Sequence, residues 1–137
     1  MKITVIDGLG GGLGSQIIDE LNSKIANHVE LIALGTNARA TSNMIDSGAD
    51  WGATGENPIK VNSEEVDIIV GPLGIIIPNS MHGEITPVMA EAIADSKASK
   101  FLIGIRQHPG QIMGMKNISI NEMIEEVTKK IKSLIEK

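Results

Sequence analysis

Residues 2–18 read Lys2-Ile-Thr-Val-Ile-Asp-Gly-Leu-Gly-Gly-Gly-Leu-Gly-Ser-Gln-Ile-Ile18, and this stretch decides the fold. Its uncharged, β-forming start, from Ile3 to Val5, predicts a buried parallel strand. Five glycines then fall within positions 8–14. The following residues place apolar side chains at helical spacing. A strand, a glycine-rich turn and a helix in this order predict an α/β protein that can hold an anion at the N-terminus of the helix.

The glycine spacing separates two kinds of nucleotide-binding loop. The G-x-G-x-x-G pattern is not met, because its last glycine would fall on Leu13 or Ser15. The pattern G-x-x-x-G-x-G is met by Gly8, Gly12 and Gly14. An alternative interpretation stays open, in which the glycines only permit tight packing between strand and helix and no nucleotide binds.

The G-x-x-x-G-x-G spacing resembles the Rossmann domain of short-chain dehydrogenases. The resemblance covers residues 3–74, with Asp67-Ile-Ile-Val-Gly-Pro-Leu-Gly in the place of that family's strand and NNAG segment. It implies a nucleotide cradle. It does not extend to that family's catalysis, which uses a Tyr-x-x-x-Lys pair, because this chain has no tyrosine.

The composition is that of an ordinary globular protein, and we expect a single Rossmann-like domain over residues 1–137. Hydrophobic residues make up 42% of the chain, and Trp and Phe occur once each. The net charge of −5 and the scarcity of aromatic residues argue against nucleic acid as a partner. The absence of cysteine excludes disulfides and thiolate metal sites. Three scattered histidines show no metal-ligand spacing, so we expect no metal.

No apolar run is long enough to cross a membrane, and the N-terminus leads directly into a strand. We therefore expect no membrane contact, no signal peptide and a cytoplasmic location.

The rest of the chain alternates between strand and helix patterns. Strands are predicted at 29–34, 51–54, 67–71 and 100–106, and helices after the caps Thr36 or Asn37, Thr86 and Ser119. A turn at 108–110 and a returning strand at 111–116 predict an antiparallel edge hairpin. Together these predict a three-layer α/β/α Rossmann-like fold with a mainly parallel sheet of order 3-2-1-4-5, the hairpin and a C-terminal helix.

The segment 49–65 allows two interpretations. In the one we favour, Trp51 begins the third strand and a helix or irregular crossover follows. In the other, residues 58–61 form the strand. That leaves too few residues before Asp67 for a parallel crossover.

A ligand of such a sheet lies beyond the carboxyl ends of the strands, between the first and fourth. Three loops meet there: the glycine loop, the loop after the second strand and the loop after the fourth. The expected ligand-binding residues are Gly8, Gly10, Gly11, Gly12, Leu13, Gly14, Thr36, Asn37, Arg39, Gly71, Pro72, Gly74, Asn79 and Ser80.

The end of the second strand bears on the choice of dinucleotide. Domains that prefer NAD usually have an acidic residue there, whereas this chain has Gly35. Arg39, with Thr36 and Asn37, could bind a 2′-phosphate, so NADP or another phosphate-bearing nucleotide is the expected cofactor. In the alternative, Thr36 and Asn37 only cap a helix and Arg39 is solvated.

His82 and Glu84 are the candidate acid–base pair, because they follow the polar residues Asn79 and Ser80 near the expected crevice. The alternative is a surface loop whose polar groups cap the next helix.

The whole chain resembles a small bacterial family of Rossmann-like proteins described as a domain of unknown function. The resemblance covers residues 2–94 and rests on IDGLGGGLG at 6–14, IALGTNARATSNMIDSGADWGATGEN at 32–57 and VDIIVGPLGIIIPNSMHGEITPVMAEAI at 66–93. It implies the fold and no activity.

Three functions follow as hypotheses. The first is a nucleotide-binding module that acts as a sensor or regulatory subunit. The second is a small enzyme that uses NADP or a phosphorylated metabolite, with His82 and Glu84 as acid and base. The third is a structural protein with an unoccupied glycine loop. An edge hairpin and an apolar C-terminal helix also predict a homodimer.

Overall fold

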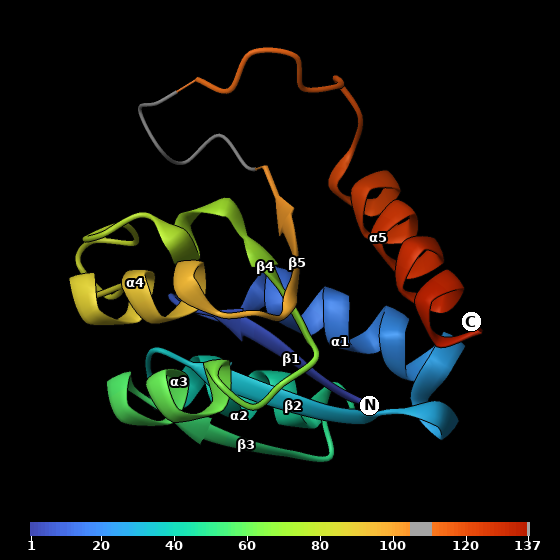
Figure 1. Ribbon diagram of the computed structural model, residues 1–137, viewed down its shortest axis with the longest axis horizontal. Coiled ribbons are helices and arrows are strands. Elements are labelled where there is room, and N and C mark those ends of the chain that lie inside the picture. Colours follow the sequence, from blue (N-terminus) through green and yellow to red (C-terminus); the bar gives the residue numbers. More distant parts are fainter. Residues whose placement is uncertain (105–110, 137) are drawn as a thin grey trace.

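The computed structural model describes residues 1–104 and 111–136. Its centre is a five-stranded sheet of order β3-β2-β1-β4-β5 in which every neighbouring pair is parallel (Figure 1). The strands are β1 (Lys2–Asp7), β2 (Glu30–Gly35), β3 (Trp51–Thr54), β4 (Ile68–Pro72) and β5 (Ser99–Ile103). The predicted strand order is confirmed, and so is the strand that begins at Trp51.

Helices cover both faces of this sheet and make three layers (Figure 1). One buried cluster joins the sheet to α1 (Gly12–Ile25), α2 (Ala38–Asp46) and α5 (Ile120–Ile135). The other joins it to α3 (Glu56–Ser63), α4 (Pro87–Asp95) and the short 3-10 helix Leu73–Ile76.

Side chains of β1 serve both clusters, as expected for a central strand. Ile3 and Val5 pack against α1, while Ile6 packs on the opposite face. Thr4 is also buried, and its hydroxyl donates a 3.1 Å hydrogen bond to the carbonyl oxygen of Ile32. The continuous apolar pattern of β1 therefore reflects burial on two sides.

The crossover from β3 to β4 is helical, so the alternative strand at 58–61 is wrong. Gly55 precedes α3 with φ +102, a left-handed conformation that suits glycine. Pro58 lies in the first turn of α3, where its missing N–H costs no helical hydrogen bond.

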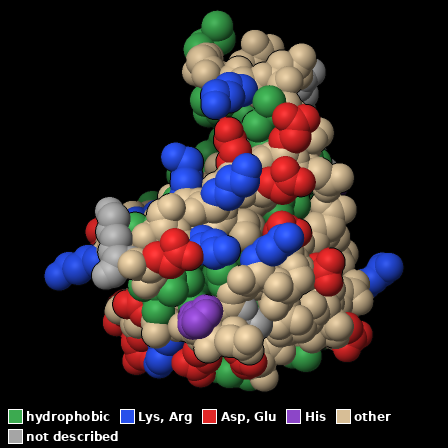
Figure 2. Space-filling model, turned by 90° about the vertical axis from the view of Figure 1, so that its right-hand side faces the viewer, with side chains coloured by type: hydrophobic (Ala, Val, Ile, Leu, Met, Phe, Trp, Pro, Cys, Tyr) green, Lys and Arg blue, Asp and Glu red, His purple; other side chains and the backbone are tan. Residues whose placement is uncertain are grey.

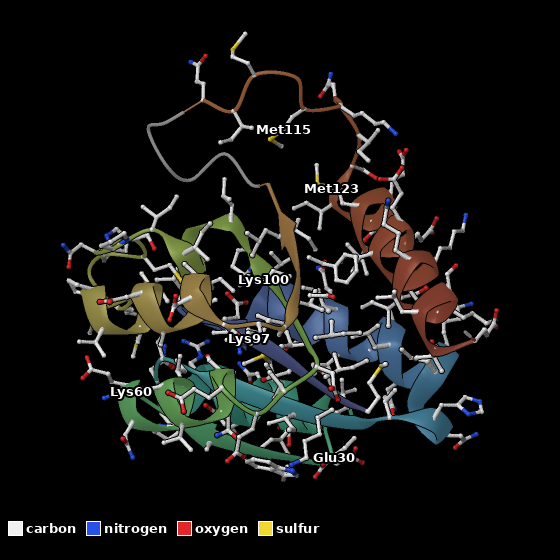
Figure 3. The ribbon with its side chains drawn as sticks, in the orientation of Figure 1. Glu30, Lys60, Lys97, Lys100, Met115 and Met123 are labelled. Carbon is white, nitrogen blue, oxygen red and sulfur yellow. The ribbon has the colours of Figure 1, made fainter. Side chains whose placement is uncertain are left out.

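The predicted edge hairpin is also wrong. β5 ends at Ile103, and residues 111–119 form no strand. Gly114 has φ +84, which interrupts an extended conformation, and Met115 lies over Gly104 (Figure 3). The predicted turn at 108–110 lies outside the described residues.

The C-terminal helix begins as its sequence predicts. The Ser119 hydroxyl accepts a 3.1 Å hydrogen bond from the Glu122 N–H. Ile124 and Ile131 lie on the side of α5 that faces the sheet, and both are buried there. The molecular face seen in Figure 2 carries basic and acidic side chains intermixed, with no large patch of one sign. Within the described ranges, no helix is both long enough and apolar enough to cross a membrane.

Candidate functional site

The carboxyl ends of β1, β2 and β4 bring three loops together. β1 lies between β2 and β4, so the crevice expected between the first and fourth strands is where the sheet order reverses. The side chain of Glu84, from the loop before α4, reaches across to both other loops. Its Oε1 accepts hydrogen bonds from the Leu9 N–H at 2.9 Å, the Thr36 hydroxyl at 2.5 Å and the Asn37 side-chain amide at 2.8 Å.

These donors determine the charge of Glu84. Partial burial would raise the pKa of its carboxyl. The hydrogen bonds from Thr36, Leu9 and Asn37, with the charge of His82, outweigh burial, and the pKa lies below its ordinary value. Glu84 is therefore ionised at neutral pH.

The two carboxylate oxygens of Glu84 differ in their contacts. Over residues 1–104 and 111–136, Oε2 has no hydrogen-bond partner. The only buried side-chain polar atoms without a partner in those residues are the hydroxyls of Ser15 and Ser63. Glu84 as a whole is partly exposed.

A second carboxylate, that of Asp7, lies beneath the glycine loop. It is buried, and its two oxygens accept hydrogen bonds from the Gly8 N–H at 2.8 Å and the Gly14 N–H at 2.7 Å. Burial raises the pKa of Asp7; the two amide hydrogen bonds oppose that rise and the charge of Glu84 adds to it. The Asp7 carboxylate is thus hydrogen-bonded to the first and last glycines of the loop, Gly8 and Gly14.

The polar side of α2 orients the peptide groups of the glycine loop. Asn37 caps α2 through a 2.9 Å bond from the Ala40 N–H, and its amide also donates to the Leu9 carbonyl at 2.8 Å. Asn43 donates to the Gly10 carbonyl at 2.8 Å. In a trans peptide the C=O and N–H point in opposite directions, so the N–H of Gly10 points away from Asn37.

The five glycines of the loop divide into two groups. A Cβ on Gly8 would meet Thr36 Oγ1 at 2.7 Å, and one on Gly14 would meet the Asp7 Cβ at 2.9 Å. Gly11 has φ +71 and lies against the α2 backbone. These three are explained by packing within the chain.

Gly10 and Gly12 are not explained in that way. Neither has positive φ, and a Cβ on either would meet nothing within 4 Å. In the described part of the chain, the N–H groups of Gly10, Gly12 and Leu13 have no hydrogen-bond partner. Backbone donors without a partner in the described residues are therefore present at the start of α1, beside two glycines whose Cβ positions meet no other atom.

The loop from Asn79 to Glu84 covers the start of the glycine loop. Asn79, Met81 and His82 all have positive φ, which is unusual for residues other than glycine. The Met81 sulfur lies 2.8 Å from the position of a Cβ on Gly8. The crevice beside Gly8 is thus filled by the chain's own side chains, while the side near Gly12 is not.

The other predicted binding residues lie in several settings. Ser80 donates its hydroxyl to the Gly74 carbonyl, which closes this loop internally. Gly71 and Pro72 belong to β4 and are buried, with the Ile6 carbonyl against Gly71. Arg39 is exposed in the first turn of α2 and forms no ion pair with any described residue.

The structure thus brings together Gly8, Thr36, Asn37 and Glu84, but it does not bring Gly71 to the surface of the site. His82 is exposed, and its acid–base role with Glu84 stays a prediction. Sequence reasoning missed Asp7, Asn43 and the Leu9 N–H. Only Asp7 carried a signal, because a charged residue at the end of an apolar strand needs a partner. In the described ranges, no group of three or more His, Cys, Asp or Glu side chains could hold a metal ion.

Fold and site define a Rossmann-like α/β protein with a glycine-rich loop at the reversal of its sheet order. The chain belongs to the family described as a domain of unknown function, DUF3842, whose model matches residues 2–136. The resemblance to a family of unknown function, found over residues 2–94, is confirmed and extends through α5.

A search of curated proteins found no match. Among solved structures, the chain is similar to a dodecameric FMN-dependent UbiX-like decarboxylase from Escherichia coli O157:H7. The two share 15% sequence identity with a TM-score of 0.49, over 98% of this chain and 76% of the other.

Proposed function

We propose that this protein is a binding module for a phosphate-bearing nucleotide, which it holds at the start of α1. The observation that carries the proposal is the pair Gly10 and Gly12. Glycine costs backbone entropy, and at these two positions no internal contact and no positive φ accounts for it. A ligand that approaches the backbone closely does account for it.

The donors at this place suit a phosphate. The N–H groups of Gly12 and Leu13 belong to the first turn of α1, where the helix dipole favours negative charge. The side-chain amides of Asn37 and Asn43 donate hydrogen bonds to the Leu9 and Gly10 carbonyls, respectively. These two oxygens are therefore already paired with donors. The ionised Glu84 restricts the phosphate to the Gly12 side of the loop, because like charges repel.

Binding without turnover is the form of the function that the contacts favour. Three donors engage Glu84 Oε1, which suits a fixed acceptor better than a proton carrier. A sensor or regulatory subunit needs only the fixed site.

Calorimetric titration with NADPH, NADH, ATP and FMN tests the proposal. Trp51 is a poor reporter, because it lies at the amino end of the edge strand β3, whereas the glycine loop follows the carboxyl end of the central strand β1. Gly12→Val places a side chain in the open space and should weaken binding at least about 10-fold, a loss of about 1.4 kcal/mol.

The matched control is Ser23→Val, which introduces the same side chain on an exposed position of α1 far along the helix. It should leave affinity unchanged. Failure of all four nucleotides to bind, or equal affinity in Gly12→Val and the wild type, would overturn the proposal.

A further inference from the structure

The end of β2 cannot carry the acidic residue with which many dinucleotide-binding domains hold a ribose hydroxyl. That position is Gly35, and a Cβ there would lie 2.6 Å from the backbone nitrogen of Thr41. Since backbone atoms of α2 occupy the space, no side chain fits without moving the helix.

The carboxylate of Glu84 nevertheless lies close to the end of β2. Two of its three donors, Thr36 and Asn37, are the two residues that directly follow β2. The third donor is the N–H of Leu9 in the glycine loop, so the carboxylate links that loop to the residues that follow β2.

We propose that Glu84 is a specificity-determining residue that accepts a hydrogen bond from a free ribose hydroxyl of the nucleotide through Oε2. This inference rests on the proposed function. Oε1 is held by three donors, whereas Oε2 has no partner within the described residues, and Glu84 is partly exposed. The acceptor is thus fixed before the ligand arrives, and binding loses little side-chain entropy.

The chemistry of a carboxylate sets the ligand class. A carboxylate oxygen accepts a hydrogen bond from a hydroxyl but repels a phosphate group in the same place. The site should therefore select a ribonucleotide with an unmodified 2′-hydroxyl and should bind NADH more tightly than NADPH. This reverses the expectation from Gly35 and Arg39, which treated the end of β2 as lacking an acid.

The test is the ratio of the NADPH and NADH dissociation constants in the wild type and in Glu84→Gln. Glutamine keeps an oxygen for the three donors and replaces Oε2 by an amide, which donates and carries no charge. The wild type should prefer NADH at least about 10-fold, the usual range for one hydrogen bond to a charged group. Glu84→Gln should bring the ratio close to one, by weaker NADH binding and tighter NADPH binding.

Glu91→Gln is the matched control, because it removes the same charge from an exposed position on α4. It should leave the ratio unchanged. If Glu84→Gln fails to fold, the wild type is titrated with adenosine 5′-monophosphate and its 2′-deoxy analogue, and loss of the hydroxyl should weaken binding at least about 5-fold.

The outcomes separate the two proposals. An unchanged ratio in Glu84→Gln, a wild-type preference for NADPH, or equal affinity for the two monophosphates overturns the role of Glu84. The glycine-loop site survives these results if Gly12→Val still weakens nucleotide binding. If no nucleotide binds the wild type, both proposals fail.

Discussion

At the scale of single residues, the two carboxylates near the glycine loop behave in opposite ways. Asp7 is buried and the pKa of its carboxyl is raised, whereas hydrogen bonds lower the pKa of Glu84. Asp7 therefore opposes folding when ionised, and Glu84 favours folding when ionised. Two carboxylates thus contact the glycine loop: Asp7 holds its backbone in place, and Glu84 is the one that we propose faces a ligand.

Asp7→Asn gives a pH dependence of known sign. Because the pKa of Asp7 is higher in the folded state than its ordinary value of 3.8, wild-type protein gains stability as pH falls through the folded-state pKa. The free energy of unfolding of the wild type, minus that of Asp7→Asn, should be largest below pH 3.8 and should decrease as pH rises through the folded-state pKa. Urea denaturation at a series of pH values measures this difference. An increase with rising pH would contradict the prediction.

The glycines of the loop should differ in their tolerance of a methyl group. Gly11→Ala forces a left-handed conformation and places a Cβ 2.8 Å from the Ala40 Cα, so it should cost about 2–4 kcal/mol. Gly10→Ala meets nothing and should change stability by less than about 1 kcal/mol. Thermal unfolding of the two variants is the measurement, and equal melting temperatures would disprove the distinction.

At the scale of elements, α2 positions the glycine loop as well as covering the sheet. Its N-cap, Asn37, joins the helix, the Leu9 carbonyl and Glu84, and Asn43 in its next turn holds Gly10. Any shift of α2 therefore changes the directions of the peptide groups that we propose bind phosphate.

Asn37→Asp separates the two tasks of that residue. Aspartate caps a helix as well as asparagine does, so a pure cap would tolerate the change. Here the change removes donors to the Leu9 carbonyl and Glu84 and adds a carboxylate beside Glu84, so the free energy of unfolding should fall by about 1–3 kcal/mol.

The double variant Asn37→Asp with Glu84→Gln is the control for charge repulsion. It should recover part of the loss, as measured in a double-mutant cycle by chemical denaturation. Full additivity of the two single changes would show that the two side chains act independently.

At the scale of the whole molecule, the parallel sheet is enclosed by two apolar clusters. The homodimer stays a prediction, but the two features that suggested it, the edge hairpin and the apolar face of the C-terminal helix, no longer support it. The hairpin is wrong, and much of the apolar side of α5 packs inside the molecule. The exposed apolar side chains of the described residues include Ile112 and Met113, in the irregular stretch before α5.

Local patterns were sufficient for most of the architecture. The apolar strands, the helix caps at Thr36 or Asn37, Thr86 and Ser119, and the alternation of elements predict a parallel sheet of the observed order, and the structure selects Asn37 as the cap of α2. The stretch 111–116 misled the prediction, because a short apolar stretch after a turn predicts a strand whether or not a partner strand lies beside it.

The sequence alone determined the fold and the existence of a glycine-rich loop before α1, because both depend on short-range periodicity and turn chemistry. Only the tertiary structure decided which glycines pack internally and which face open space. It also decided the place of Glu84, whose donors at Leu9 and Thr36 are 75 and 48 positions away along the chain. No local pattern encodes that meeting, since it arises when separate strands end at one edge of a sheet.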